Sequence, residues 1–246
     1  MSPRRLGQHF LNDPKILARI VDALEVTSSD VVLEIGPGKG SLTRELLARG
    51  VTVIAIERDR RLASQLRAPA LTVIEGDALE LAWPPTNKVV GNIPYYITSP
   101  LIDKALTPPL PERVVFLVQD EVADRLAAPP GGKTYGALSV NVQAVCRVEK
   151  LFTVAPGAFK PPPKVRSALI RLRPLAEPLV QYGEIEALRA FVTACFSKRR
   201  KQHKNAVPGV TEPMLRELGF DPKARSETLA PAAFVRLLRA VQWYLR

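Results

Sequence analysis

The residues of this sequence best suited to chemistry form the run Asn-Ile-Pro-Tyr at 92–95, directly after a short apolar stretch at 88–91. The side-chain oxygen of Asn92 and the backbone carbonyl of Ile93 could together accept both hydrogens of an exocyclic amino group. The nitrogen lone pair would then face an electrophilic methyl group, while Tyr95 stacked on the base. No strong base is needed, because the nitrogen becomes acidic once alkylated, so positioning and electrostatics supply most of the acceleration. We therefore predict amino-group methyl transfer, with Asn92, Pro94 and Tyr95 catalytic; the alternative is a buried turn that the asparagine caps.

A glycine-rich turn at 36–40 lies between an apolar run at 31–35 and a helical pattern of leucines. Its spacing is G-x-G-x-G, one residue shorter than the G-x-G-x-x-G of dinucleotide-binding turns. That spacing favours S-adenosylmethionine, which has no pyrophosphate to seat on the helix, and Gly36 and Gly38 would let the backbone approach it closely. Glu57 ends the next apolar run, about 20 residues on, where a carboxylate can accept both ribose hydroxyls. A strand–helix turn without a ligand is the alternative.

Three further positions could complete such a site, and each has a structural alternative. Asp77, with Ala78 beside it, follows the apolar run 71–74 and could accept a hydrogen bond from an adenine amino group, or cap the following turn. His9 precedes the first predicted helix and could touch a ligand or serve as a surface or packing residue. Phe159 opens a proline-rich segment and could form the second face of a base sandwich or a hydrophobic plug.

Apolar strand patterns alternate with helical patterns through most of the chain, which predicts an α/β domain. The family resemblance described below implies that this domain is Rossmann-like. The strands are expected at 31–35, 51–56, 71–74, 88–91, 114–118 and 165–172. Helices are expected from Pro14 to Leu24, after the glycine turn, after Asp59, and at 98–106, 119–128 and 135–145. Around 174–178 the pattern changes to helices alone. We expect a catalytic domain at 1–175 and a small all-α RNA-binding domain at 176–246.

The 246-residue chain has a net charge of +11, and its basic residues are unevenly placed. Residues 1–146 hold 16 Lys+Arg and 16 Asp+Glu, whereas residues 147–246 hold 19 and 8. A neutral part joined to a basic part favours a polyanionic substrate, with nucleic acid first. The densest cluster is predicted to bind RNA phosphates, the alternative being a solvated charge run. It comprises Lys198, Arg199, Arg200, Lys201 and Lys204.

Composition excludes several other classes. No apolar run reaches the ~18 residues of a membrane span, and the first residues lack the apolar segment of a secretory signal. Cys146 and Cys195 are far apart among apolar neighbours, and two histidines offer no metal-ligand pattern, so we expect reduced core thiols and no metal. We therefore expect a cytoplasmic protein, a monomer with no membrane partner.

Taken together, these motifs closely resemble the ribosomal RNA adenine N6-dimethyltransferases of the KsgA family, over nearly the whole chain. The matching segments are 7–11, 34–40, 57–59, 76–78, 92–95, 119–123, 135–140, 159–168 and 196–201. The resemblance implies S-adenosylmethionine contacts at His9, Leu11, Gly36, Glu57, Asp77 and Asn92. It implies dimethylation of two adjacent adenosines near the 3′ end of small-subunit ribosomal RNA, within an assembling 30S particle. The chain departs from the family at His9, where many relatives have Asn, and in a short C-terminal domain.

Two other functions share this fold. Erm-type enzymes methylate large-subunit ribosomal RNA and carry the same Asn-Ile-Pro-Tyr motif, but 36–38 and 99–100 look more like the KsgA family. A non-catalytic RNA-binding assembly factor is the other alternative, against which the intact Glu57, Asp77 and 92–95 argue.

Overall fold

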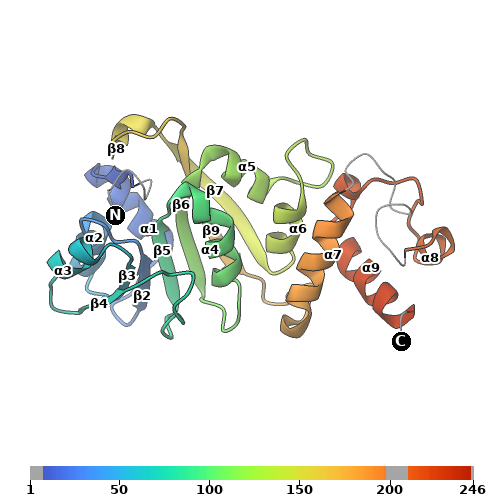
Figure 1. Ribbon diagram of the computed structural model, residues 1–246, viewed down its shortest axis with the longest axis horizontal. Coiled ribbons are helices and arrows are strands. Elements are labelled where there is room, and N and C mark those ends of the chain that lie inside the picture. The colour runs from blue at the N-terminus through green and yellow to red at the C-terminus, as the bar shows by residue number, and fades with distance from the viewer. Residues whose placement is uncertain (1–7, 198–209, 245–246) are drawn as a thin grey trace. The chain divides into compact units, whose positions relative to one another are not determined.

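The computed structural model describes residues 8–197 and 210–244 (Figure 1). The chain forms two compact units, each built from two segments of sequence. The first comprises 1–123 and 149–174, and the second comprises 124–148 and 175–246.

A seven-stranded sheet, in the order β4-β3-β2-β5-β6-β9-β7, forms the centre of the first unit. Its strands are β2 (Val31–Ile35), β3 (Thr52–Glu57), β4 (Leu71–Glu75), β5 (Lys88–Asn92), β6 (Arg113–Gln119), β7 (Cys146–Val154) and β9 (Ser167–Pro174). The pairs from β4 through β6 are parallel, and β9 runs antiparallel to β6. The carboxyl ends of β2, β3 and β5 therefore meet at one edge, where ligands bind in open α/β sheets.

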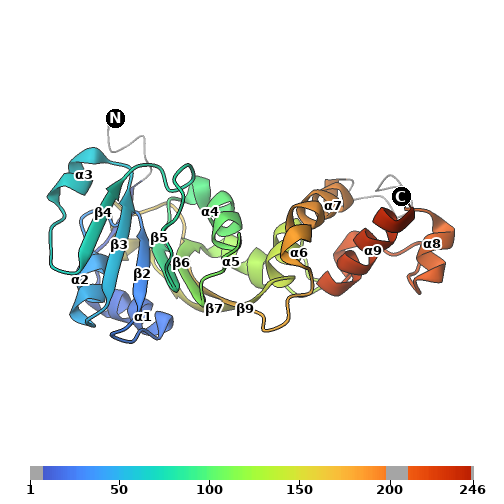
Figure 2. The same cartoon turned by 90° about the horizontal axis from the view of Figure 1, so that it is seen from below.

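Side chains from both faces of the sheet are buried, as expected of a parallel sheet covered by helices on each side (Figure 2). Helices α1 (Pro14–Leu24) and α2 (Ser41–Ala48) contribute Leu17, Ile20 and Leu46 to one core, together with Val32 and Val90 of the strands. Alternate strand residues such as Leu33 and Val89 point to the opposite face and are also buried. Burial on both faces therefore holds the strands, and hence their carboxyl ends, in fixed positions.

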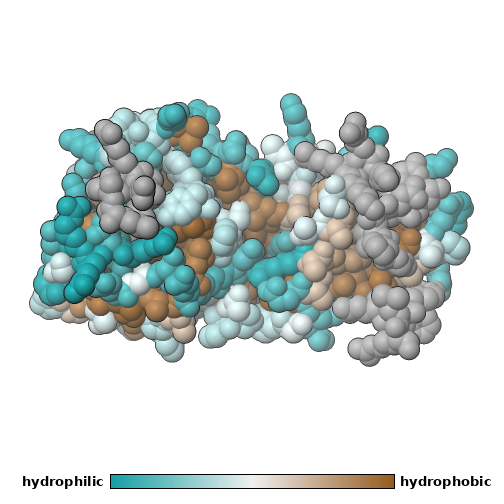
Figure 3. Space-filling view, in the orientation of Figure 1, coloured by the Kyte–Doolittle hydropathy of each residue, from teal (hydrophilic) through white to brown (hydrophobic). Residues whose placement is uncertain are grey.

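The other helices of this unit are α3 (Arg60–Gln65), α4 (Thr98–Ala105) and the start of α5 (Asp120–Ala127). Helix α1 begins as predicted: Asp13 accepts hydrogen bonds from the backbone N–H groups of Lys15 and Ile16, and Pro14 occupies the first turn. The arginines around α3, Arg58, Arg60, Arg61 and Arg67, are exposed. The end of the unit that carries α2 and α3 accordingly shows mainly hydrophilic residues in Figure 3.

A two-stranded antiparallel sheet lies beside the cavity described below. It pairs β1 (Phe10–Leu11) with β8 (Phe159–Lys160), which joins segments nearly 150 positions apart in the sequence. All six predicted strands and the predicted helices of this region are confirmed, with ends shifted by one or two residues. The strands β1, β7 and β8 were not predicted.

The second unit is helical in its described part, apart from the start of β7. Its helices are the end of α5, α6 (Ala137–Gln143), α7 (Ile185–Ser197), α8 (Glu212–Glu217) and α9 (Pro231–Tyr244). The Tyr135 hydroxyl, whose residue is buried, donates to the carbonyl of Leu229 at 2.9 Å. The 124–148 segment therefore packs with the C-terminal helices, whereas the sequence assigns it to the domain 1–175. That division into a catalytic and an RNA-binding domain stays a prediction.

Two predictions from composition concern the interior and the membrane. Cys146 and Cys195 are both buried, which raises the pKa of each thiol to about 12 and leaves it protonated. Within 8–197 and 210–244, every helix is too short or too polar to span a bilayer.

Candidate functional site at the carboxyl edge of the sheet

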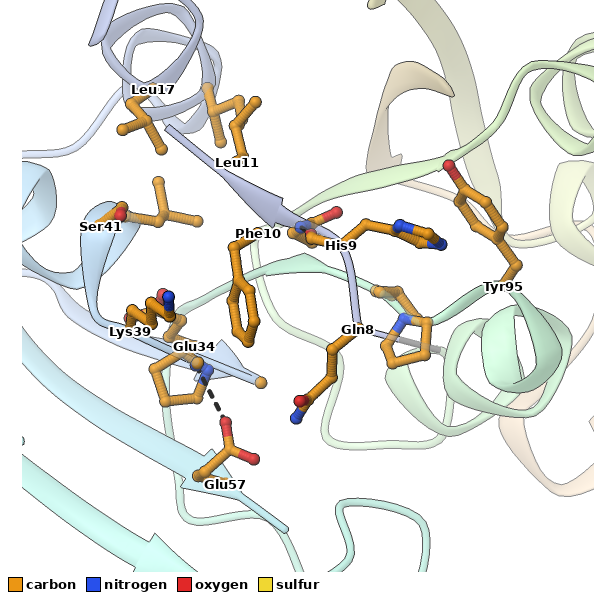
Figure 4. A pocket seen from close by; sticks show the side chains of 18 residues that line it. Gln8, His9, Phe10, Leu11, Leu17, Glu34, Lys39, Ser41, Glu57 and Tyr95 are labelled. Atoms are coloured by element: carbon orange, nitrogen blue, oxygen red, sulfur yellow. Dashed lines mark hydrogen bonds between the residues drawn. The ribbon is translucent and has the colours of Figure 1, made fainter. Parts of the chain in front are cut away.

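A cavity opens at the carboxyl ends of β2, β3 and β5 and holds about 810 Å³ of space that is open to solvent. The lining residues comprise 8–11 with Leu17 and Ile20, then Glu34, 36–39, Ser41, Leu42 and Glu57, and finally 92–95. Figure 4 shows them converging from the N-terminal segment, the glycine turn and the strand ends.

Strand register explains why three predicted residues meet here. Ile35 of β2 pairs with Ile56 of β3 on one side and with Gly91 of β5 on the other. The next residue of each strand, Gly36, Glu57 or Asn92, therefore lies at the same level of the sheet. The sequence prediction placed these residues at strand ends, and the register brings them together.

Gly36 and Gly38 have positive φ angles of 68° and 57°, a conformation that L side chains rarely adopt. A Cβ at Gly36 would meet nothing within 4 Å, so its backbone faces open space. A Cβ at Gly38 would lie 2.9 Å from Cε1 of Phe10. Glycine at 36 thus leaves room in the cavity, and glycine at 38 makes room for an aromatic ring.

Glu57 is 4 % exposed, and backbone N–H groups on two sides fix its carboxylate. The Gly38 N–H donates to Oε2 at 2.9 Å, and the Asp59 N–H donates to Oε1 at 2.8 Å (dashed in Figure 4 for Gly38). Burial raises the pKa of this carboxyl, while the two backbone hydrogen bonds oppose the rise. Each oxygen keeps a second lone pair with which it can accept a hydroxyl.

Glu34 is a second buried carboxyl in the lining, and the residue-by-residue sequence prediction did not single it out. It is 1 % exposed, and the Thr43 hydroxyl donates to its Oε2 at 2.6 Å. Burial raises its pKa to about 7, and the neighbouring charge of Glu57 adds to the rise. Its position within the apolar run 31–35, directly before the glycine turn, is the sequence signal that could have identified it.

The side chain of Asn92 is oriented by a backbone group of the N-terminal segment. Its Nδ2 donates to the carbonyl of His9 at 2.7 Å. This hydrogen bond assigns the two ends of the amide, since only the nitrogen can donate, and it leaves Oδ1 as an acceptor. An acceptor at the end of β5 is the arrangement that the methyl-transfer prediction requires.

His9 and Tyr95 form the opposite wall of the cavity. Their rings are stacked, with centroids 5.9 Å apart and an interplanar angle of 29°. The His9 Nδ1 lies 2.8 Å from the carbonyl of Pro161, and the Tyr95 hydroxyl lies 2.8 Å from the hydroxyl of Ser167. Burial raises the pKa of Tyr95, which keeps the phenol protonated. His9 therefore lines the cavity and packs against Tyr95, while its contact with a ligand stays a prediction.

Three other lining residues, Gln8, Phe10 and Lys39, were not predicted individually. The Phe10 ring points into the cavity in Figure 4, and Gln8 extends beside it. The Lys39 ammonium lies 5.0 Å from the centroid of the Phe10 ring. The resemblance of segment 7–11 to a known family was the sequence signal for Gln8 and Phe10, and Lys39 lies within the predicted glycine-rich turn at 36–40.

Other predicted site residues lie outside this lining. Asp77 lies just past the end of β4, as expected, but its carboxylate accepts the Leu79 N–H at 2.9 Å and pairs with Arg58 at 3.2 Å, as the turn-capping alternative predicts. Ala78 is buried beside it. Phe159 is 2 % exposed and belongs to the hydrophobic core, a placement that matches the plug and not the base sandwich. The cationic residues predicted to bind RNA, 198–201 and 204, lie outside the described residues.

Comparison with known proteins adds a family to this geometry. The family model described as ribosomal RNA adenine dimethylase matches residues 2–242. The chain is 45 % identical, over 92 % of each protein, to a ribosomal RNA small subunit methyltransferase A from Thermosynechococcus vestitus. It is similar to the crystal structure of a dimethyladenosine transferase from Plasmodium falciparum, with a TM-score of 0.85 and 33 % identity over 96 % of this chain and 98 % of that one. The structure of the 23S rRNA methyltransferase ErmE is also similar, with a TM-score of 0.74 and 34 % identity over 95 % and 99 %.

Proposed function

This chain belongs to the ribosomal RNA adenine dimethylase family, and from that premise we propose that it dimethylates two adjacent adenosines near the 3′ end of small-subunit ribosomal RNA. S-adenosylmethionine is the proposed methyl donor. The observation that carries the proposal is the fixed amide of Asn92, whose nitrogen is engaged by His9 and whose oxygen stays an acceptor.

The cavity residues fit the proposed donor. Glu57 is a buried carboxylate whose free lone pairs can accept the two ribose hydroxyls, and hydrogen bonds to an ionised acceptor are the stronger kind. Gly36 faces open space, so its backbone can approach a ligand. Leu11 and His9 belong to the same lining. Asp77 and Ala78 lie outside the cavity lining. The proposal includes a contact between the donor and the turn at 77–81, which contains both residues.

The residues at the end of β5 fit an amino-group acceptor. Asn92 Oδ1 and the Ile93 carbonyl accept the two N6 hydrogens of adenine, which presents the nitrogen lone pair. Tyr95, braced by Ser167 and His9, stacks on the base. The donor supplies a methyl group on sulfonium: the C–N bond forms as the C–S bond breaks, a neutral thioether leaves, and the N6 proton passes to water. The two fixed acceptors and the stacked ring supply most of the rate acceleration, because they need no reorganisation in the transition state.

The small-subunit target rests on the relatives. Proteins that are 41–46 % identical, including those of Gloeobacter violaceus and Pseudomonas aeruginosa, are named ribosomal RNA small subunit methyltransferase A. An RNA target also suits the net charge of +11. In this proposal the target base leaves its stack to reach the cavity, as enzymes that modify bases generally require. An assembling 30S particle as the physical substrate, and a monomeric enzyme, complete the proposal.

The test combines one variant with a map of modified adenosines. Asn92→Ala removes the proposed acceptor and should lower turnover on unmethylated small subunits by about 100-fold or more, the usual cost of a fixed transition-state group. Asn141→Ala, on α6 of the second unit, is the matched control and should keep near-normal turnover. Full turnover of Asn92→Ala would overturn the mechanism. Methylated adenosines that map to large-subunit RNA would overturn the choice of substrate.

A further inference from the structure

A cluster of one carboxylate and two cations lies next to the Tyr95 wall of the cavity. The Asp120 Oδ2 pairs with the Arg166 guanidinium at 2.9 Å, and its Oδ1 pairs with the Lys150 ammonium at 2.7 Å. Hydrogen bonding to Lys150 is the main cause that lowers the pKa of Asp120, so the carboxylate stays ionised at neutral pH. The Asp120 carboxylate thus pairs with two cations at once, one on each oxygen.

The cluster is tied to the cavity through the first residue of β9. Ser167 holds the Tyr95 hydroxyl at 2.8 Å, and Arg166 is the residue directly before it. The Arg166 carbonyl accepts the backbone N–H of Asp120 at 3.0 Å. This hydrogen bond holds the start of β9 against the first residue of α5. Because consecutive Cα atoms are about 3.8 Å apart, the Arg166 backbone lies within one residue of the group that braces Tyr95.

The side chain of Arg166 is available to a partner, because it is 67 % exposed, whereas that of Asp120 is 15 % exposed. A guanidinium has five N–H donors, and the carboxylate engages one edge of it, so donors remain for a second planar or tetrahedral anion. The surrounding chain reinforces the charge: residues 150–176 contain six Lys+Arg and no Asp or Glu. Of these six, Arg171 and Arg173 lie at the other end of β9, where they pair with Glu25 and Glu149.

We propose that Arg166 binds a phosphodiester group of the RNA beside the target adenosine, with Asp120 as the residue that positions its guanidinium. This inference rests on the proposed function. A base stacked on Tyr95 carries its own backbone past the rim of the cavity, where Arg166 lies one residue from Ser167. Arginine suits the role, since its planar fork matches two phosphate oxygens. The proposed contact is assigned to a residue of the first unit, in addition to the phosphate contacts predicted from sequence for 198–201 and 204.

The test compares two single-arginine variants in binding to unmethylated small ribosomal subunits. Arg166→Ala should weaken binding about threefold to tenfold and reduce the slope of log affinity against log salt by about one, because one phosphate contact is lost. Arg49→Ala removes the same charge and also breaks exposed ion pairs, with Asp22 and Glu45, at the opposite edge of the sheet. It should leave the slope within about 0.3 of the wild-type value, as expected when no phosphate contact is lost. Affinity for S-adenosylmethionine should be unchanged in both.

A third variant separates positioning from charge alone. Asp120→Asn makes the cluster more positive, so a purely electrostatic role predicts tighter RNA binding, whereas a positioning role predicts a higher KM with little change in kcat. Circular dichroism would check that each variant folds. Equal salt slopes for Arg166→Ala and Arg49→Ala in an active wild-type background would overturn the inference, and tighter binding by Asp120→Asn would overturn the positioning role. Failure of the proposed function is distinguishable, because wild-type protein would then transfer no methyl groups to small-subunit RNA.

Discussion

Glu34 should make the stability of the first unit fall as pH rises through the neutral range. Its pKa is about 7 in the folded protein, against 4.5 for an ordinary glutamate, so between these values the folded state holds a proton that the unfolded state has released. Stability rises with pH only where the unfolded state binds more protons, and here the opposite holds. The folded state therefore loses stability between pH 4.5 and pH 7 through this group.

The size of the effect follows from the shift. One pKa unit corresponds to about 1.4 kcal/mol, so the full shift is worth about 3 kcal/mol above pH 8. About 2 kcal/mol of that accumulates between pH 5 and pH 7. Conversion of the shift to free energy is appropriate because Glu34 is 1 % exposed and hence little screened by solvent.

The perturbation is Glu34→Gln, which keeps an oxygen for the Thr43 hydroxyl but cannot ionise. Urea unfolding followed by circular dichroism at pH 5, 6, 7 and 8 gives the free energy of unfolding of both proteins. We expect the variant to gain about 2 kcal/mol relative to wild type between pH 5 and pH 7. A buried amide NH₂ without a partner adds a cost of about 1–3 kcal/mol, but this cost is the same at every pH. Parallel pH profiles for the two proteins would refute the reasoning.

Two further substitutions test the structure and the site. Asp30 is held by Lys88, Thr27 and Asn87, and although burial alone would raise its pKa, these hydrogen bonds outweigh it and lower the pKa to about 2. Asp30→Asn should therefore cost about 2 kcal/mol at pH 7, a difference from wild type that disappears as pH falls through 4 toward 2. A constant difference in urea unfolding would contradict this. Glu57→Ala should raise the dissociation constant of S-adenosylmethionine at least about tenfold by calorimetry, through lost hydrogen bonds to the ribose. A change within twofold would remove Glu57 from the site.

The strand ends that line the cavity could be predicted from sequence because their residues follow local rules. Gly36, Glu57 and Asn92 each follow an apolar strand pattern, and parallel strands bring such ends to one edge. Strand β7 escaped prediction because its sequence, CRVEKLFTV, mixes charged residues into a strand that is only half-buried. Periodicity is a weak signal in such a segment.

Contacts between distant segments were beyond sequence reasoning. No spacing rule joins Phe10 to Lys160, or the carbonyl of His9 to Asn92, yet these contacts close the cavity and orient its amide. The role of Phe159 was likewise beyond what the sequence alone could decide. Its residue type allowed two roles, and only its burial in the core distinguishes the plug from the stacking ring.

The two-segment construction of the second unit bears on how such proteins can be cut or recombined. The chain leaves the first unit after Ala123, returns after Val148 and leaves again after Pro174, which makes three crossings. Truncation at residue 175 would strip Tyr135 of its Leu229 acceptor and Gly131 of its Glu227 acceptor. A graft of this unit onto another methyltransferase would have to carry both segments, so a single splice point cannot exchange it.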